Sequence, residues 1–407
     1  MNLKSERDRF FSYYKEANFL RFKQFDLERD ILGIAYTLFD AEKRIKQGEK
    51  IDKLNIYISS DTYERIDNIK LKNLLRELIL LILLEDIKIK ILPIDDFRGR
   101  VKKEIGFPKK EAVILFSAGV DSYAGVKIAE KIYPQLIGLF VAHNDQPRII
   151  NIVDNIRHSI TTEIRTLYAP GMGSQGYSQL RGFLYVLSAG AYCNLCQADN
   201  ILVTECGPTM YQPMFSPYDS ITYTTHPYVL RAAKEVLDIL LPKKVNLIIP
   251  FEDLTKAEVI TNSGIMDFSR THSCVSQRFG NHDGSCFGCV IKRIACLVSG
   301  VKDVSYKKDI FDDKVYFDNL AHLLAFSCDL LNNFEGMPNF ETEKILEFGK
   351  EDLFHRFALD NLAGFMIGTN KKHQLFKRYV KDPDELEVRL SHVRTDSKQP
   401  DFKKMVD

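Results

Sequence analysis

The feature that most constrains the fold is a regular alternation of apolar strands and helical segments between residues 113 and 263. Five short runs are rich in β-branched and aromatic residues, and each is followed by a segment with helical periodicity. The runs are VILFS, LIGLFVA, TEIRTLY, NILVTE and VNLIIP. Such alternation is typical of an α/β fold, a parallel sheet with helices on both faces. We expect its ligand site just after the strand ends, which are Ser117, Ala142, Tyr168, Glu205 and Pro250.

The segments on either side of this core have different patterns. Before it, two helices at 26–47 and 71–84 alternate with strands at 54–60 and 87–93, and a polar stretch with Gly and Pro follows. From about residue 301 onward the sequence is mainly helical. We therefore predict a small N-terminal α/β accessory domain, a central domain and a helical C-terminal region, with the boundaries 1–108, 109–300 and 301–407.

Composition and charge indicate a soluble cytoplasmic protein. The chain has 407 residues, 45% of them apolar, and a formal net charge of +1, so no overall field attracts nucleic acid or anionic lipid. Its longest apolar stretch is interrupted by Arg76, Glu77 and Glu85, which favours a buried helix over a membrane span. Eight cysteines without an export signal indicate a reducing compartment. We expect neither a membrane nor a nucleic-acid partner.

The turn after the first core strand has the residue types of a phosphate-binding loop. It comprises Ser117, Ala118, Gly119, Val120, Asp121 and Ser122. Gly119 permits a ligand to approach the backbone closely, the two serines offer hydroxyl groups, and the N–H groups of the following helix point toward an anion. The alternative is a helix N-terminus without a ligand, because Asp121 also suits the helix dipole.

A second segment at a strand end carries a cation that capping does not explain. Thr255 and Glu258 form a capping box at the start of the helix after VNLIIP, which is a structural role. Lys256 has no part in that cap, and it is well placed to neutralise a phosphate group.

Three cysteines close together in the sequence predict a metal site. Cys286 and Cys289 form a C-x-x-C turn that leads into a helix, and Cys274 precedes them. Such a turn places two thiolates on one metal ion, and a third thiolate nearby makes Zn²⁺ the natural choice. Free cysteines packed on a helix of small residues are the alternative.

Together these motifs resemble the QueC family of PP-loop ATPases, the 7-cyano-7-deazaguanine synthases. The family pattern is S-G-G-x-D-S, an arginine at a helix start, T-K-A-E and a four-cysteine zinc site, and residues 109–298 follow this order with Arg181 as the arginine. The resemblance implies a PP-loop, Rossmann-like sheet in which residues 117–122 bind the phosphates of ATP with Mg²⁺. It also implies that Asp121, Lys256 and Arg181 act in adenylating a carboxylate, with release of AMP when a nucleophile attacks.

The substrate side of the family pattern is changed in this chain. Ala118 replaces the first glycine of the phosphate loop, Gly182 replaces the asparagine after the arginine, and residues 205–209 replace the base-recognition stretch. Glu205 could accept hydrogen bonds from a guanine-like base, and with Arg181 it would orient the base or its carboxylate. A solvated strand end is the alternative for Glu205.

The fourth metal ligand of the family is also missing, because its position falls on Lys292. We therefore predict that Zn²⁺ is bound by Cys274, Cys286, Cys289 and His282. His272 is the second choice for the fourth ligand, and a site without metal remains an alternative.

The additional terminal regions make the chain similar in layout to the QatC-type proteins of bacterial anti-phage defence operons. This similarity implies a 7-carboxy-7-deazaguanine-like substrate that is adenylated and transferred to ammonia or to an amine of a partner protein from the same operon. Assembly of the chain into a homo-oligomer is an alternative to a monomer.

Two other functions are compatible with the sequence. One is a catalytically weakened nucleotide-binding scaffold in a defence complex, suggested by the changed motif positions. The other is a PP-loop enzyme that modifies tRNA, in which Cys193 and Cys196 would serve sulfur transfer. Packing of these two small residues against the sheet is the favoured interpretation.

Overall fold

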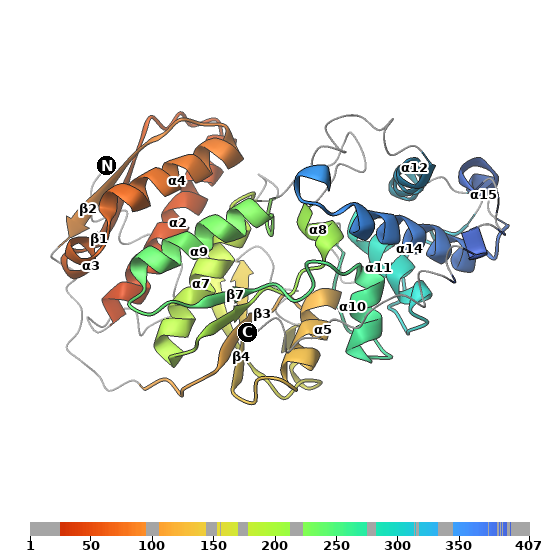
Figure 1. Ribbon diagram of the computed structural model, residues 1–407, viewed down its shortest axis with the longest axis horizontal. Coiled ribbons are helices and arrows are strands. Elements are labelled where there is room, and N and C mark those ends of the chain that lie inside the picture. The colour runs from red at the N-terminus through yellow and green to blue at the C-terminus, as the bar shows by residue number, and fades with distance from the viewer. Residues whose placement is uncertain are drawn as a thin grey trace.

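The computed structural model describes most of residues 25–94, 106–143, 153–169, 178–211, 223–274, 282–332 and 345–391. Its centre is a five-stranded sheet in which all neighbouring strands are parallel (Figure 1), as predicted. The strand order is β5-β4-β3-β6-β7. The strands are β3 (Ala112–Leu115), β4 (Leu136–His143), β5 (Glu163–Ala169), β6 (Asn200–Leu202) and β7 (Asn246–Ile248).

Helices cover both faces of this sheet because successive side chains of a strand point to opposite sides. Val113 and Ile201 lie in the apolar cluster that contains helices α7 and α9, whereas Ile114 and Leu202 lie in the cluster that contains α5 and α10. The helix bounds are α5 (Val120–Ala129), α7 (Arg181–Cys196), α9 (Pro227–Leu240) and α10 (Lys256–Ser263). The mixed α/β architecture predicted from the alternation is therefore confirmed.

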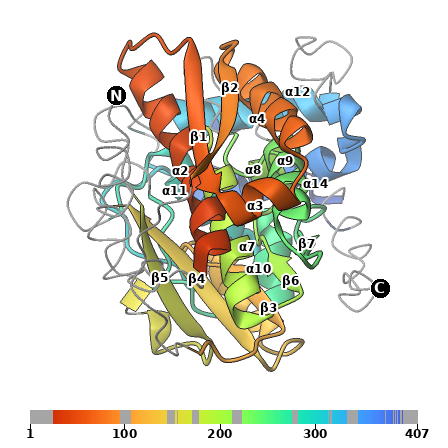
Figure 2. The ribbon, with the colours of Figure 1, turned by 90° about the vertical axis from the view of Figure 1, so that its left-hand side faces the viewer.

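The N-terminal region is a small α/β unit that packs against the core. Its two strands are parallel, and its helices lie beside α7 and α9 (Figures 1 and 2). The elements are α2 (Asp26–Lys46), β1 (Lys53–Ser59), α3 (Ser60–Arg65), α4 (Asn68–Leu83) and β2 (Lys88–Ile94). One continuous apolar cluster contains side chains of this unit and of α7 and α9, so the two parts share a core.

A buried glutamate joins the N-terminal region to the core. Glu42 of α2 has no exposed surface, and its carboxylate accepts hydrogen bonds from Ser178 Oγ, from Gln179 N at 2.5 Å and from Leu180 N at 3.0 Å. Lys46 Nζ lies 2.9 Å from Glu42 Oε1. The two N–H groups immediately precede α7, so this carboxylate lies at the positive end of the helix dipole.

The region after residue 282 is helical in the part that the structure describes. Helix α14 lies between α11 and α12 (Figure 1). Gly364 of α14 permits this close packing, because a Cβ atom there would come within 2.7 Å of Ile294 Cγ2 in α11. The helices are α11 (Phe287–Val298), α12 (Asp318–Asn332), α14 (Glu351–Thr369) and α15 (Gln374–Tyr379).

The structure differs from the sequence-based expectation in several local features. Strand β6 ends at Leu202, three residues before the predicted end, and the two short helices α3 and α8 (Gly207–Tyr211) were not predicted. Most of the predicted helix at 147–158 lies outside the described residues, although 156–157 are helical. None of the helices in the described ranges combines the length and the apolar character that a membrane span requires.

Replacing Glu42 by glutamine tests the anchor between the N-terminal region and α7. The amide keeps the size of the side chain but removes the charge that three donors and Lys46 face. We expect the free energy of unfolding to fall by about 2 kcal/mol, measured by urea denaturation, because buried hydrogen bonds to charged groups contribute about 1.5–3 kcal/mol. Glu49→Gln is the matched control, since Glu49 is exposed and pairs with Arg44 at the surface. An equal loss in both variants would contradict the anchor.

Candidate functional site

The loops after β3 and β6 lie at the same edge of the sheet. The chain enters the sheet at β3 in its centre, continues outward to β5, and then returns to β6 on the other side of β3. Loops that diverge at such a point form the usual ligand site of a parallel sheet. The predicted phosphate loop follows β3, and Glu205 follows β6, so the fold brings these two predicted site segments together.

Ala118 in the phosphate loop has a backbone conformation that favours glycine. Its φ angle is 62°, in the left-handed region, and its side chain is fully buried. This conformation costs an L-residue about 1–2 kcal/mol. A hydrogen bond of 2.8 Å from His272 N to the Ala118 oxygen holds the residue in place. Glycine would adopt this backbone conformation without strain, whereas alanine adopts it at a cost.

Two serines close the loop on itself. Ser117 N donates to Ser122 Oγ at 3.2 Å, and Ser122 Oγ donates to the Gly119 oxygen at 3.2 Å. Gly119 N lies 3.4 Å from Ser117 Oγ. The turn therefore has a shape fixed by its own hydroxyl groups, and helix α5 begins directly after Gly119.

Two carboxyl groups, an ammonium group and a thiol meet beside this loop. Lys256 Nζ donates to Asp121 Oδ2. A carboxyl oxygen of Asp121, a carboxyl oxygen of Glu205 and the sulfur of Cys206 lie within 4.8 Å of one another. Asp121 and Cys206 are buried, and the Lys256 side chain is 13% exposed. Such a compact group of ionisable side chains is characteristic of functional sites.

Burial decides the protonation states in this group. Burial and the neighbouring Asp121 carboxylate raise the pKa of Glu205 to about 8, against the opposing charges of Lys256 and Arg181. Burial by itself would lower the pKa of Lys256, but Asp121 and Glu205 raise it above its usual value. Burial also raises the pKa of the Cys206 thiol to about 12. At neutral pH the group is therefore an Asp121–Lys256 ion pair beside a protonated Glu205 and a neutral thiol.

Lys256 is the first residue of α10, and the predicted capping box is formed by Thr255 before it and Glu258 after it. Thr255 Oγ1 accepts a hydrogen bond from Glu258 N at 3.3 Å, and Thr255 N donates to Glu258 Oε2 at 2.8 Å. The cap fixes the direction in which the helix begins. The lysine side chain can therefore reach Asp121 from a defined backbone position.

Arg181 opens helix α7 and acts on the same group through its charge. Its guanidinium NH2 donates to Thr224 Oγ1 at 3.3 Å, and its positive charge lowers the pKa of Glu205. Gly182 is required by the same neighbour, because a Cβ atom at this position would lie 1.3 Å from the Thr224 oxygen. The asparagine of the related pattern would not fit here. His226 acts as a helix cap, since its Nδ1 accepts a hydrogen bond from Tyr228 N at 3.3 Å.

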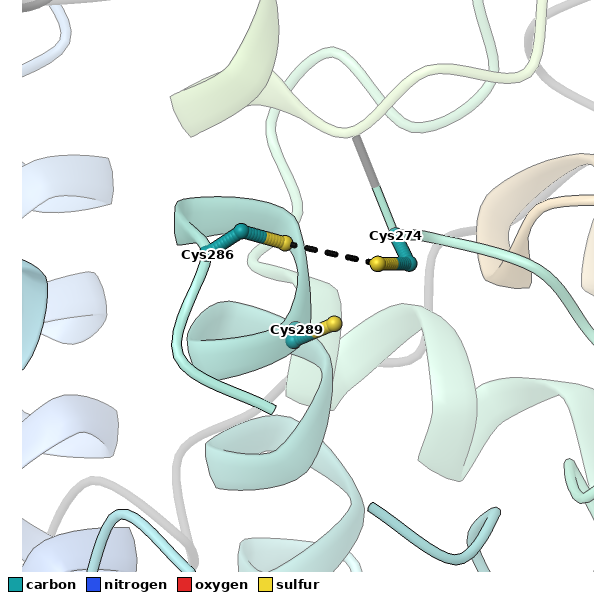
Figure 3. A group of neighbouring side chains, drawn as sticks. All are labelled: Cys274, Cys286 and Cys289. Carbon is teal, nitrogen blue, oxygen red and sulfur yellow. Dashed lines mark hydrogen bonds between the residues drawn. The ribbon is translucent and has the colours of Figure 1, made fainter. Parts of the chain in front are cut away.

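The three predicted cysteine ligands form a second group (Figure 3). Cys286 lies at the start of α11 and Cys289 in its first turn, and Cys274 faces them from a preceding segment. Their sulfur atoms lie within 4.8 Å of one another, with 3.8 Å between Cys286 and Cys274, and all three residues are buried. The adjacent Cys286 thiol and burial raise the pKa of Cys289. A metal ion such as Zn²⁺ fits this group, because it would stabilise thiolates that are otherwise unfavourable.

His282 does not join the cysteine group. Among the described residues, only the sulfur atoms of Cys274, Cys286 and Cys289 lie within 4.8 Å of one another in this group. Its ring centroid lies 5.2 Å from that of His272. In both rings Nδ1 is buried without a hydrogen-bond partner among the described residues. Burial lowers the pKa of His282 to about 4, so the ring is neutral. Its role as fourth ligand stays a prediction that requires a change of ring position.

Lys292, at the position of the missing cysteine, has a structural role. The side chain is completely buried, and its Nζ donates to the oxygens of Phe268 at 3.2 Å and Thr271 at 3.0 Å. Asp303 Oδ1 lies 3.0 Å from the same Nζ. The ammonium group therefore fastens the segment 268–274, which carries Cys274 and also holds Ala118 of the phosphate loop through His272 N. This segment connects the two groups of side chains.

Cys193 and Cys196 are packed in the core. Both have no exposed surface, and Cys193 Sγ lies 3.6 Å from the Asn200 oxygen. Burial raises the pKa of both thiols. This placement favours packing as their role, and it gives no support to sulfur transfer.

No protein-family model matches the chain, and a search of curated proteins finds no match.

The pH dependence of stability tests the protonated state of Glu205. The native state keeps a proton up to a pKa of about 8, whereas the ordinary value is 4.5, so the unfolded chain binds fewer protons between these values. Stability contributed by this group is therefore lost as pH rises from about 5 to about 8. Relative to wild type, Glu205→Gln should gain on the order of 3 kcal/mol of unfolding free energy over this range. Urea unfolding at several pH values measures the difference, and parallel profiles would refute it.

Replacing Lys292 by methionine tests the buried ammonium group. The change removes the buried cation that donates to the Phe268 and Thr271 oxygens and pairs with Asp303. The Asp303 carboxylate then loses this ammonium partner, so we expect a loss of about 3 kcal/mol in the free energy of unfolding. We also expect less Zn²⁺ to remain after dialysis, because the segment carrying Cys274 is no longer fastened. Lys302→Met is the control, since this lysine pairs with Asp267 at the surface. Cys286→Ala lacks one of the three thiolates, so its zinc content is the reference for an incomplete site. Equal zinc content in Lys292→Met, Lys302→Met and wild type would overturn the link.

Proposed function

We propose that this protein is an ATP-dependent enzyme that adenylates a 7-deazaguanine carboxylate and transfers it to an amine, in an anti-phage defence system. One observation carries the proposal. The loop Ser117–Ser122 at the end of the central strand lies beside a buried group that contains Asp121, Lys256 and Glu205. Glycine-containing loops at this point of a parallel sheet, followed by a helix N-terminus, bind phosphates.

In this proposal, each side chain has a distinct part. Residues 117–122 surround the phosphates, and Lys256 offsets the negative charge that develops as pyrophosphate leaves. Mg²⁺ would accompany ATP, with the carboxyl groups of Asp121 and of Glu205 as its oxygen ligands, and Glu205 would lose its proton when the ion binds. Arg181 orients the substrate carboxylate. Catalysis is then mainly positioning and electrostatic stabilisation.

The proposed reaction has two bond-forming steps. A carboxylate oxygen of the deazaguanine attacks the α-phosphorus of ATP, and the bond to pyrophosphate breaks. The amine nitrogen then attacks the carboxyl carbon, the bond to AMP breaks, and the nitrogen gives up one proton to solvent to leave the amide. Ammonia and an amine of a partner protein are the two acceptors to compare. Zn²⁺ held by Cys274, Cys286 and Cys289 would stabilise the segment that supports the loop.

A nucleotide-binding scaffold without turnover is the second candidate. It is favoured by the strained Ala118 and by the internal hydrogen bonds of the two serines, which a phosphate would have to replace. A scaffold of this kind would bind ATP and release no AMP.

The decisive experiment measures AMP and pyrophosphate from ATP and 7-carboxy-7-deazaguanine, with ammonia or candidate partner proteins as acceptors. We expect wild type to form both products and Asp121→Asn to reduce the rate on the order of a hundredfold, because the ion pair with Lys256 is lost. Asp329→Asn, at an exposed position of α12, should match wild type. ATP binding without AMP from any acceptor would favour the scaffold, and no ATP binding would refute both functions.

A further inference from the structure

The C-terminal helix α14 contacts the segment that carries the lysine of the candidate site. Lys256 lies within residues 252–258, and this segment faces residues 350–360 of the C-terminal region. In Figure 1, α14 extends from the region of α8 across α11. The contact joins the part of the chain predicted as an appendage to the group that contains Asp121.

Thr255 connects the two segments through its hydroxyl group. The residue is completely buried, and its Oγ1 donates to Asp360 Oδ2 at 2.5 Å. The same oxygen accepts the capping hydrogen bond from Glu258 N. A hydroxyl group has one proton to donate, so a carboxylate acceptor is a good partner for a threonine that also caps a helix. Asp360 therefore fixes the rotamer of the residue directly before Lys256.

Arg356 binds the other end of the first turn of α10, at Glu258. Its NH1 pairs with the Glu258 carboxylate, its NH2 donates to the Asp253 oxygen at 3.0 Å, and its Nε donates to Asp352 Oδ2 at 3.0 Å. The planar guanidinium group can satisfy such separate acceptors, which an ammonium group cannot do in the same geometry. Lys350 adds an ion pair with Asp253 at 2.5 Å.

We propose that Asp360 and Arg356 are positioning residues that hold Lys256 against Asp121, so that the C-terminal region completes the candidate site. The inference deepens the proposed function and rests on it for the role of Lys256 in catalysis. The capping box by itself would start α10, but it does not fix the turn relative to β3. The contacts from Asp360 and Arg356 of α14 supply a second reference point for this turn.

The first test uses the adenylation assay with Asp360→Ala and Arg356→Lys. A displaced Lys256 stabilises the leaving pyrophosphate less well, so we expect kcat to fall on the order of tenfold to a hundredfold. The KM for the deazaguanine carboxylate should stay unchanged, because neither residue contacts it in the proposed arrangement. Asp360→Asn keeps an acceptor oxygen for Thr255 and should recover most of the rate. Glu351→Gln is the control, since it lies exposed on the same helix.

A second measurement uses thermal unfolding and needs no substrate. It can also be made on variants that are less stable than wild type. The coupling between Asp121→Asn and Lys256→Met is obtained from the thermal unfolding of wild type, both single variants and the double variant. We expect this coupling to shrink at least about twofold in the Arg356→Lys and Asp360→Ala backgrounds and to persist in Glu351→Gln.

The two measurements separate the possible failures. If wild type forms no AMP, the proposed function fails, and the coupling still decides whether α14 positions Lys256. Unchanged coupling in the Asp360→Ala and Arg356→Lys backgrounds overturns the positioning role. So does a wild-type kcat in these variants when wild type is active, or a loss that Asp360→Asn does not recover.

Discussion

Burial of the Asp121–Lys256 ion pair is the constraint on which the candidate site depends. Removing two charges from water is costly unless geometry and further hydrogen bonds compensate for the lost hydration. The surrounding structure supplies this compensation from several elements. Glu205 contributes a neutral carboxyl group because its pKa is raised to about 8, and the capped start of α10 fixes the lysine backbone. A second full carboxylate at this place would repel the Asp121 carboxylate in a buried environment, with Lys256 and Arg181 as the opposing charges.

Ala118, Gly182 and Lys292, which differ from the motifs compared in the sequence analysis, each have a local structural explanation. Ala118 occupies a left-handed backbone conformation held by His272 N. Gly182 leaves room for the Thr224 carbonyl group, and Lys292 uses its three N–H groups on Phe268, Thr271 and Asp303. Such accounts show that the changed residues are integrated in the fold.

The sheet and its covering helices could be predicted because their signal is local. Strands buried on both faces are apolar throughout, and the alternation with helices repeats five times. The grouping of Asp121, Lys256 and Glu205 also followed from topology, since strand ends of a parallel sheet share one edge. Cys206 was missed because its only signal was its place after Glu205. The partners of Glu42 and Lys292 could not be predicted, since they are loop residues and backbone atoms distant in sequence.

The hydrogen bond from Thr255 to Asp360 has a consequence for the synthesis of the chain on the ribosome. Its two ends are separated by 105 residues, which take roughly 5–20 s to synthesise. During that interval the sheet strands have all been made, but α14 has not, so the turn that carries Lys256 lacks its outer contacts. The sequence separation is larger for Glu42, because its partner Ser178 is synthesised 136 residues later. All five strands of the sheet are therefore synthesised before α14, whose contacts we propose hold Lys256 in place.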